Sequence, residues 1–171
     1  MAKKRFKVDI LSPSSVSALK NELEAYRKSL PYKASELARR LSEAGVPIAR
    51  MNVVELDAVF TGDLINSIHG EYVSSKPFGA IFSIVASSEH ALFVELGTGI
   101  VGARHPYPGK LPVVYAQGKT IRHLADGRYG WFYEKDGKWY FTEGMPSRPF
   151  LYNTALDLVS LVPKIAKEVF K

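Results

Sequence analysis

The hydrophobic positions near the N-terminus follow two periods. Residues 5–10 alternate between polar and apolar side chains, which predicts a half-buried strand. From there the apolar positions lie three or four residues apart, on one face of a helix: Val16, Leu19, Leu23, Tyr26 and Leu30. The helical spacing resumes after Pro31 and stops at Gly45. We therefore expect two helices, or one helix kinked near Pro31, over residues 15–45.

The central part of the chain combines short helices with a hairpin. A turn and a short helix capped at Thr61 or Asp63 come first. Residues 70–75 and 80–87 are rich in β-forming side chains and flank a Pro-Phe-Gly turn, which predicts a hairpin. The second of these runs is apolar on both faces, which favours a central strand. Residues 89–96 then predict another short helix, which ends at the glycine that follows.

A long loop leads to the clearest local signal in the chain. Residues 99–130 are rich in glycine and proline and lack a convincing period, as expected of a functional loop. Asp136 and Gly137 then separate two aromatic runs, which predicts a two-residue hairpin turn over residues 131–142. Both faces of this ribbon are aromatic. We therefore expect it to pack on the domain and also to contact something else, for which a neighbouring subunit is an obvious candidate.

The C-terminal segment predicts a helix that begins near Pro149. Its expected apolar face is Leu151, Ala155, Leu158, Val159 and Val162. Pro163 is expected to divide this helix from a final one. The fold class that follows is α+β in a single domain, residues 1–171. We expect a small, mostly antiparallel sheet, a long N-terminal helix, a C-terminal helix packed on the sheet, and a protruding aromatic hairpin.

Composition narrows the chemistry. The chain has 171 residues and no cysteine, which excludes disulfides, thiolate metal sites and cysteine nucleophiles. No run of 18 apolar residues occurs, so we expect no membrane contact. The four histidines lack metal-ligand spacing, and neither a phosphate-loop ending nor a G-x-S-x-G elbow is present. We therefore expect no enzyme activity, no cofactor, no metal and no small-molecule substrate.

Charge is uneven along the chain. Residues 1–50 carry a net charge of +6, residues 51–100 carry −5 and residues 101–171 carry +5. An acidic centre between basic ends suits electrostatic matching between copies of one chain. The alternative is a small basic nucleic-acid-binding protein of a phage or mobile element. Its candidate phosphate contacts are Lys3, Lys4, Arg5, Lys7, Arg39, Arg40 and Arg50.

Four separated segments carry short motifs in a fixed order. They are Leu37-Ala-Arg-Arg-Leu41 before an Ala-Gly pair, Thr61-Gly-Asp-Leu-Ile-Asn-Ser-Ile68, Ala91-Leu-Phe-Val-Glu-Leu-Gly-Thr-Gly99 and Gly144-Met-Pro-Ser-Arg-Pro-Phe-Leu151. Together they resemble the HK97 gp10-like family of tailed-phage head–tail joining proteins, also called neck or tail-completion proteins. The family has Tyr, Phe and Ala where this chain has His90, Leu96 and Ser147.

The resemblance implies a structural virion protein of a tailed bacteriophage or prophage. Such a subunit assembles into a ring in the neck, joins head to tail and lets DNA pass through a channel. Its partners are then copies of itself and other connector and tail proteins, in the host cytoplasm before assembly and in the virion afterwards. The residues that match the family's motifs, which we expect to be structural, are Gly62, Leu64, Ser67, Ile68, Val94, Glu95, Gly97, Thr98, Gly99, Gly144, Arg148, Pro149 and Phe150.

Two further expectations concern particular contacts. Glu95 is expected to hold the loop that follows it, or to pair with the guanidinium of Arg148. The candidate residues for contact with a neighbouring subunit are Arg5, Lys7, Trp131, Tyr133, Trp139 and Tyr140.

Overall fold

The computed structural model of the protein describes residues 7–59, 62–111, 115 and 120–171. It confirms the α+β class, with a long N-terminal helix, a C-terminal helix and two small two-stranded antiparallel sheets. The chain forms two compact units. The first comprises Met1–Val46, Gly70–Ile84 and Asp157–Lys171, and the second comprises Pro47–His69 and Val85–Leu156.

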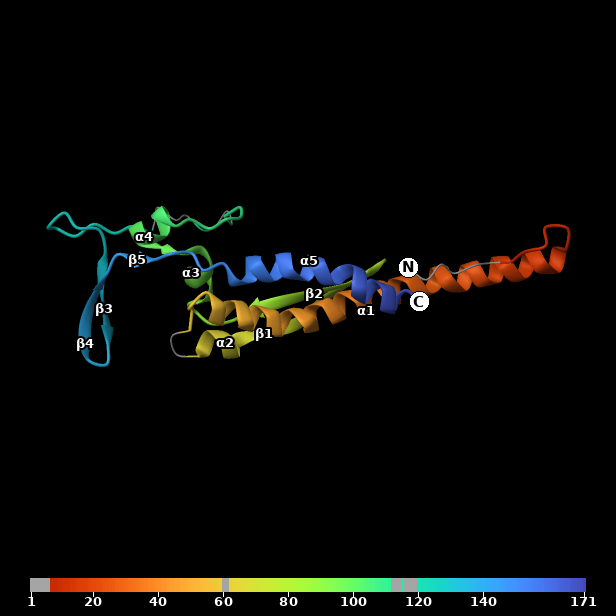
Figure 1. Cartoon of the computed structure of the whole chain (residues 1–171), viewed down its shortest axis with the longest axis horizontal. Helices are drawn as coiled ribbons and strands as arrows, with labels where there is room; N and C mark the ends of the chain where they lie inside the picture. The colour runs from red at the N-terminus through yellow and green to blue at the C-terminus, as the bar shows by residue number, and fades with distance from the viewer. Residues whose placement is uncertain (1–6, 60–61, 112–114, 116–119) are drawn as a thin grey trace. The chain divides into compact units, whose positions relative to one another are not determined.

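The N-terminal helix is a single element, α1, that runs from Pro13 to Glu55 over 43 residues. Figure 1 draws α1 as one unbroken ribbon, and Pro31 and Pro47 both lie within its bounds. The predicted end at Gly45 is wrong, and packing explains why a glycine stands there. A Cβ at this position would lie 2.2 Å from the Ile84 Cδ1 atom of the adjoining hairpin, so the glycine permits close approach within a continuous helix.

The predicted N-terminal strand is also wrong for its described part. Residues 7–9 form no strand, and the chain turns at Ile10 and Leu11 before α1 begins. The turn is held by local hydrogen bonds, because the backbone N–H of Asp9 donates to Ser15 Oγ at 2.9 Å. Arg5 lies outside the described residues. The alternation of polar and apolar residues did not by itself distinguish a strand from an exposed segment that precedes a helix.

The first unit contains the predicted hairpin, with β1 at Ile68–Lys76 and β2 at Gly79–Ala86. The prediction that β2 is a central strand is wrong, since β1 is its only neighbour among the described strands. The helix α1 contacts β2 instead of a second neighbouring strand. Ser42 of α1 donates from Oγ to the carbonyl oxygen of Ser83 at 3.2 Å, which fixes α1 against β2.

The C-terminal helix α5 runs from Phe150 to Val169 without a break at Pro163, so the predicted division there is wrong. Ile165, Ala166 and Val169, which follow the proline, remain half-buried, and this packing favours a continuous helix. The predicted apolar face is wrong in part. Leu151 and Leu158 are half-buried, but Val159 is 68% exposed. The fully buried positions of α5 are Phe150 and Thr154.

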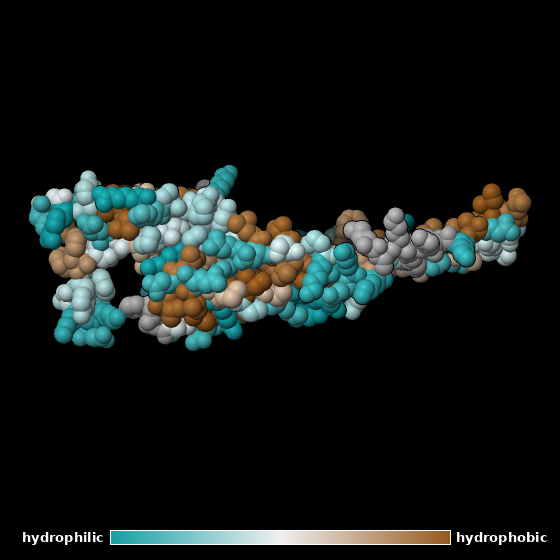
Figure 2. Space-filling view, viewed as in Figure 1, coloured by the Kyte–Doolittle hydropathy of each residue, from teal (hydrophilic) through white to brown (hydrophobic). Residues whose placement is uncertain are grey.

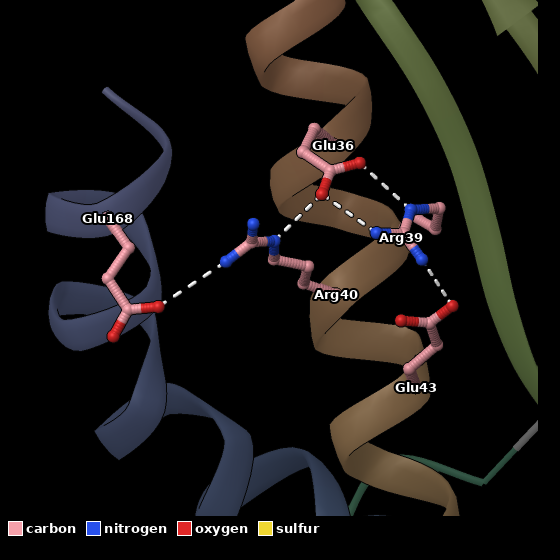
Figure 3. A network of polar contacts seen from close by, with 5 residues as sticks. All are labelled: Glu36, Arg39, Arg40, Glu43 and Glu168. Carbon is pink, nitrogen blue, oxygen red and sulfur yellow. Dashed lines mark hydrogen bonds and ion pairs between the residues drawn. The ribbon is translucent and has the colours of Figure 1, made fainter. Parts of the chain in front are cut away.

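An ion-pair network joins α1 to α5 within the first unit (Figure 3). Arg40 lies 2.7 Å from Glu36 on its own helix and 3.3 Å from Glu168 on α5. Arg39 pairs with Glu36 and with Glu43. Hydrogen bonds from the two guanidinium groups lower the pKa of Glu36 to about 2. Two of the arginines considered for phosphate contact are therefore engaged by carboxylates.

The second unit contains the remaining elements. They are α2 at Asp63–Ser67, α3 at Ala91–Leu96, α4 at Gly99–Arg104, β3 at Trp131–Lys135, β4 at Lys138–Thr142 and β5 at Gly144–Met145. The predicted loop 99–130 thus begins with a short helix, α4. The cap of α2 is Gly62 and not Asp63, and Thr61 lies outside the described residues.

The predicted aromatic hairpin is confirmed in its register. Lys135 pairs with Lys138, and Tyr133 pairs with Tyr140. Asp136 has a φ of 53° and Gly137 a φ of 73°, as a two-residue turn of this kind requires.

The hydrophobic core lies in the second unit. Every described hydrophobic residue that is fully buried belongs to it: Ala49, Val53, Ala58, Leu64, Ile68, Ala91, Val94, Leu96, Tyr115 and Phe150. The described part of the first unit has half-buried apolar contacts instead. Its elements therefore leave much apolar surface open to solvent.

A buried hydrogen bond in the second unit gives a test of this core. Asn52 Nδ2 donates to Thr154 Oγ1 at 3.1 Å, and Thr154 is 1% exposed. Thr154→Val removes this acceptor at nearly constant volume. We expect it to lower the free energy of unfolding by about 1–3 kcal/mol, measured by chemical denaturation. Ser160→Ala, on the exposed side of α5, is the control and should change stability little. Equal stability of both variants would contradict this role for Thr154.

Candidate functional site

Two of the motif segments meet in the second unit, although about fifty residues separate them in the sequence. Thr98 forms a bridge with Met145, and Gly99 forms a bridge with Gly144. The Thr98 hydroxyl oxygen accepts from the backbone N–H of Met145 at 3.3 Å. We call this contact between residues 97–99 and 143–147 the motif junction.

The motif junction requires glycine. Gly97, Gly99 and Gly144 all have positive φ, at 76°, 64° and 105°. A Cβ on Gly99 would lie 2.2 Å from the carbonyl oxygen of Glu143, and one on Gly144 would lie 2.1 Å from that of Thr98. Backbone atoms cannot move aside as a flexible side chain can. The glycines therefore allow two chain segments to touch along their backbones.

Glu95, which precedes the junction, caps the N-terminus of α5. Its carboxylate accepts from the backbone N–H groups of Leu151 at 2.9 Å and of Tyr152 at 3.0 Å. The side chain is 7% exposed. Burial raises the pKa of Glu95, while hydrogen bonds from the start of α5 and from Tyr107 oppose the rise. The partial positive charge at the N-terminus of the helix also stabilises a carboxylate at this position.

The predicted ion pair between Glu95 and Arg148 is wrong. Among the described side chains no ion pair joins them, and Arg148 instead contributes its backbone N–H, which donates to the carbonyl oxygen of Val94 at 2.8 Å. Orphan N–H groups in the first turn of a helix compete for a nearby carboxylate, and here they hold it. Pro149 supplies the carbonyl oxygen that accepts from the N–H of Asn153, so it immediately precedes the helix.

The second motif segment, Thr61-Gly-Asp-Leu-Ile-Asn-Ser-Ile68, has its described residues in the same unit. Gly62 has a φ of 84°, and Leu64 and Ile68 are buried in the core. Ser67 donates from its hydroxyl to the carbonyl oxygen of Leu64 at 2.8 Å. The Ile68 carbonyl oxygen accepts from the guanidinium of Arg50 at 2.8 Å, so this arginine is also engaged within the protein.

The hairpin candidates form an exposed aromatic patch in the second unit. Trp139 is 68% exposed, Tyr140 43% and Tyr133 41%. Trp131 is half-buried at the base of the hairpin, where it lines a hollow with Phe93 and Arg122. The other described candidate, Lys7, is exposed in the first unit, so the structure does not place it in this patch.

Sequence reasoning missed one residue of the patch and one surface elsewhere. Phe132 is 49% exposed and shares a face of the hairpin with Trp139, as its alternation with Tyr133 already indicated. The apolar stripe that begins at Val16 was predicted as one face of a helix, but its exposure was not predicted. Val16, Leu23 and Leu30 are exposed. The regular alternation of three-residue and four-residue steps was the available signal.

Other properties of the described residues bear on chemistry. No three His, Asp or Glu side chains within them come together as metal ligands would. Likewise, none of the helices in the described ranges is long and apolar enough to cross a membrane. Compared with protein-family models, with curated proteins and with solved structures, the chain matches none of them.

The motif junction gives a test by glycine substitution. We expect Gly144→Ala to lower the free energy of unfolding by more than about 2 kcal/mol, because it adds both strain and a clash with backbone. Gly137→Ala is the control, since its φ is 73° but nothing lies within 4 Å of the new Cβ. It should cost about 1 kcal/mol. Thermal and chemical denaturation measure both, and equal losses would contradict a crowded junction.

The raised pKa of Glu95 gives a pH test. The folded protein holds this proton more tightly than the unfolded chain does, so stability from this group is present below its ordinary pKa of 4.5 and is lost as pH rises through the raised value. Glu95→Gln should flatten that decline in the free energy of unfolding. Glu134→Gln, on the exposed hairpin, should leave the pH profile unchanged. Parallel profiles for the Glu95 variant and the native protein would contradict this effect.

Proposed function

We propose that the protein is a non-enzymatic structural subunit of a tailed phage or prophage, which assembles into a ring in the neck, joins head to tail and lets DNA pass. The ordered motif segments and their resemblance to the HK97 gp10-like family support this proposal. The virion location and the partnership with other connector and tail proteins rest on that resemblance.

The exposed aromatic hairpin is the observation that carries the proposal. Its rings pair across the strands, with centroids 5.3 Å apart for Phe132 and Phe141 and 5.7 Å apart for Tyr133 and Tyr140. A two-stranded ribbon that is aromatic on both faces is poorly suited to remain in water. Such rings are typical of protein interfaces, where Trp and Tyr contribute most of the binding energy.

The charges of the hairpin favour a head-to-tail arrangement of copies. The face with Tyr133 and Tyr140 also carries Lys135 and Lys138, whereas the face with Trp139 carries Glu134. Two unlike faces on one element suit a heterologous contact, in which one face of a subunit meets the other face of its neighbour. Heterologous contacts form a closed ring when the rotation from one subunit to the next divides a full turn evenly.

The nucleic-acid alternative has less support from the described contacts. Arg39, Arg40 and Arg50 are engaged by carboxylates or by a carbonyl oxygen of the same protein. Arg128, the arginine against the hairpin, lies with its guanidinium carbon 4.8 Å from the centroid of the Phe141 ring and pairs with Asp126 at 2.7 Å.

The test is to make phage particles with Trp139→Ala in this protein and to examine them by electron microscopy. We expect filled heads and finished tails to accumulate apart, because the variant subunit loses a central aromatic contact worth about 2 kcal/mol or more. Tyr32→Ala, which removes an exposed aromatic side chain (74% exposed) from α1 in the first unit, is the control and should give joined particles. Circular dichroism of both purified variants establishes that they fold.

Two outcomes would contradict the proposal. One is a normal yield of joined, infectious particles from a phage that lacks the protein. The other is tight DNA binding by the isolated protein with steep salt dependence, which the alternative function predicts.

A further inference from the structure

The N-terminal part of α1, residues 13–30, is a helical segment that the described residues of the chain cover little, and we call it the arm. Within the first unit, α5 ends beside Lys33, whose Nζ donates to the carbonyl oxygen of Lys171 at 2.8 Å. The hairpin turn reaches a similar level, since a Cβ on Gly79 would lie 3.2 Å from the Ala34 Cβ atom. Among the residues that the structure describes, the neighbours from α5 and the hairpin that cover α1 in this unit therefore begin near the end of the arm.

The arm nevertheless carries a continuous apolar stripe. Val16 is 45% exposed, Leu23 46% and Leu30 37%, and Leu19 and Tyr26 are half-buried between them. Two shallow hollows lie along the stripe. The one nearer Leu30 is bordered on one side by the hairpin turn at Phe78, which is 85% exposed. Figure 2 shows brown, hydrophobic residues gathered at the N-terminal end of the helix. Helices gain most of their stability by burying such a stripe.

The spacing of the stripe is that of a coiled-coil seam. Its members are separated by three, four, three and four residues, so they occupy the a and d positions of successive heptads. Val16, Leu23 and Leu30 take the a positions. Residues beside the seam are charged, with Lys20 and Arg27 at e positions and Glu22 at a g position.

We propose that the arm packs against the arm of a second copy of this chain, parallel and in register. In a parallel pair, each g residue lies opposite the next e residue of the other helix. Glu22 of one arm then faces Arg27 of the second copy, and the reciprocal pair forms by symmetry. Two opposite-charge contacts therefore flank the apolar seam.

The same charges disfavour the antiparallel arrangement. Antiparallel helices bring e positions together, and here both e positions are basic, Lys20 and Arg27. Charge complementarity thus selects one partner and one direction. This inference goes beyond the proposed function, because the arm lies in the first unit and the aromatic hairpin in the second.

Cross-linking tests the arrangement directly, because the chain has no native cysteine. Val16→Cys and Leu30→Cys each place one thiol on the seam. With a short thiol-reactive cross-linker, each variant alone should give covalent dimers in high yield. Ala18→Cys lies outside the seam and is the matched control, which should stay largely monomeric. Circular dichroism checks that each variant keeps its helix content.

A charge exchange tests the specific contacts. Glu22→Lys alone and Arg27→Glu alone should each weaken self-association by roughly tenfold, measured by analytical ultracentrifugation. A mixture of the two variants should associate as well as the native protein, since each mixed pair is oppositely charged. Glu24→Lys makes the same change in charge outside the seam and should have little effect.

Several results would overturn the inference. They are cross-linking at residues 16 and 30 no higher than at residue 18, products that form only between Val16→Cys and Leu30→Cys chains, and failure of the mixture to restore association. Binding of the arm to anionic vesicles without seam cross-links would assign the stripe to a membrane instead. The Trp139→Ala variant should keep the seam cross-links, and their loss would show that the arms do not pair by their own surface.

Discussion

Close backbone approach at the motif junction is the constraint on which the second unit depends. Segments from opposite sides of the long loop touch there because Gly97, Gly99 and Gly144 have no Cβ at the points where the two backbones come closest. The carboxylate of Glu95 lies at the start of α5 and accepts from two half-buried backbone N–H groups that have no partner within the helix. Phe150, the first residue of α5, is fully buried in the core. The residues around the motif junction therefore fix the positions of the loop, of the start of α5 and of a core side chain.

Local chemistry made parts of this fold predictable from the sequence. The Asp-Gly turn determined the register of the aromatic hairpin, because only residues tolerant of positive φ fit that turn. The glycine at position 97 likewise marked the end of the short helix α3. The partner of Glu95 was not predictable, since choosing between the Arg148 guanidinium and the first N–H groups of a helix needs the position of that helix.

Other errors have a common physical origin in tertiary packing. Pro31, Pro47 and Pro163 lie inside helices that continue past them, so the one hydrogen bond lost at each proline does not end the helix. Gly45 was interpreted as a helix end, but the structure shows that it allows the helix to approach Ile84 closely. The period of the Val16 stripe predicted a helix correctly but could not say what covers it, since a seam for another chain and a face for a core have similar patterns.

The two prolines within α1 have a mechanical consequence. A proline supplies no N–H, so the carbonyl groups of Arg27 and Glu43, four residues earlier, receive no helical hydrogen bond from it. A helix interrupted in this way bends more readily at those points than elsewhere along its length. We therefore expect α1 to bend near Pro31, so that the arm on the N-terminal side of the proline changes direction while its residues stay helical.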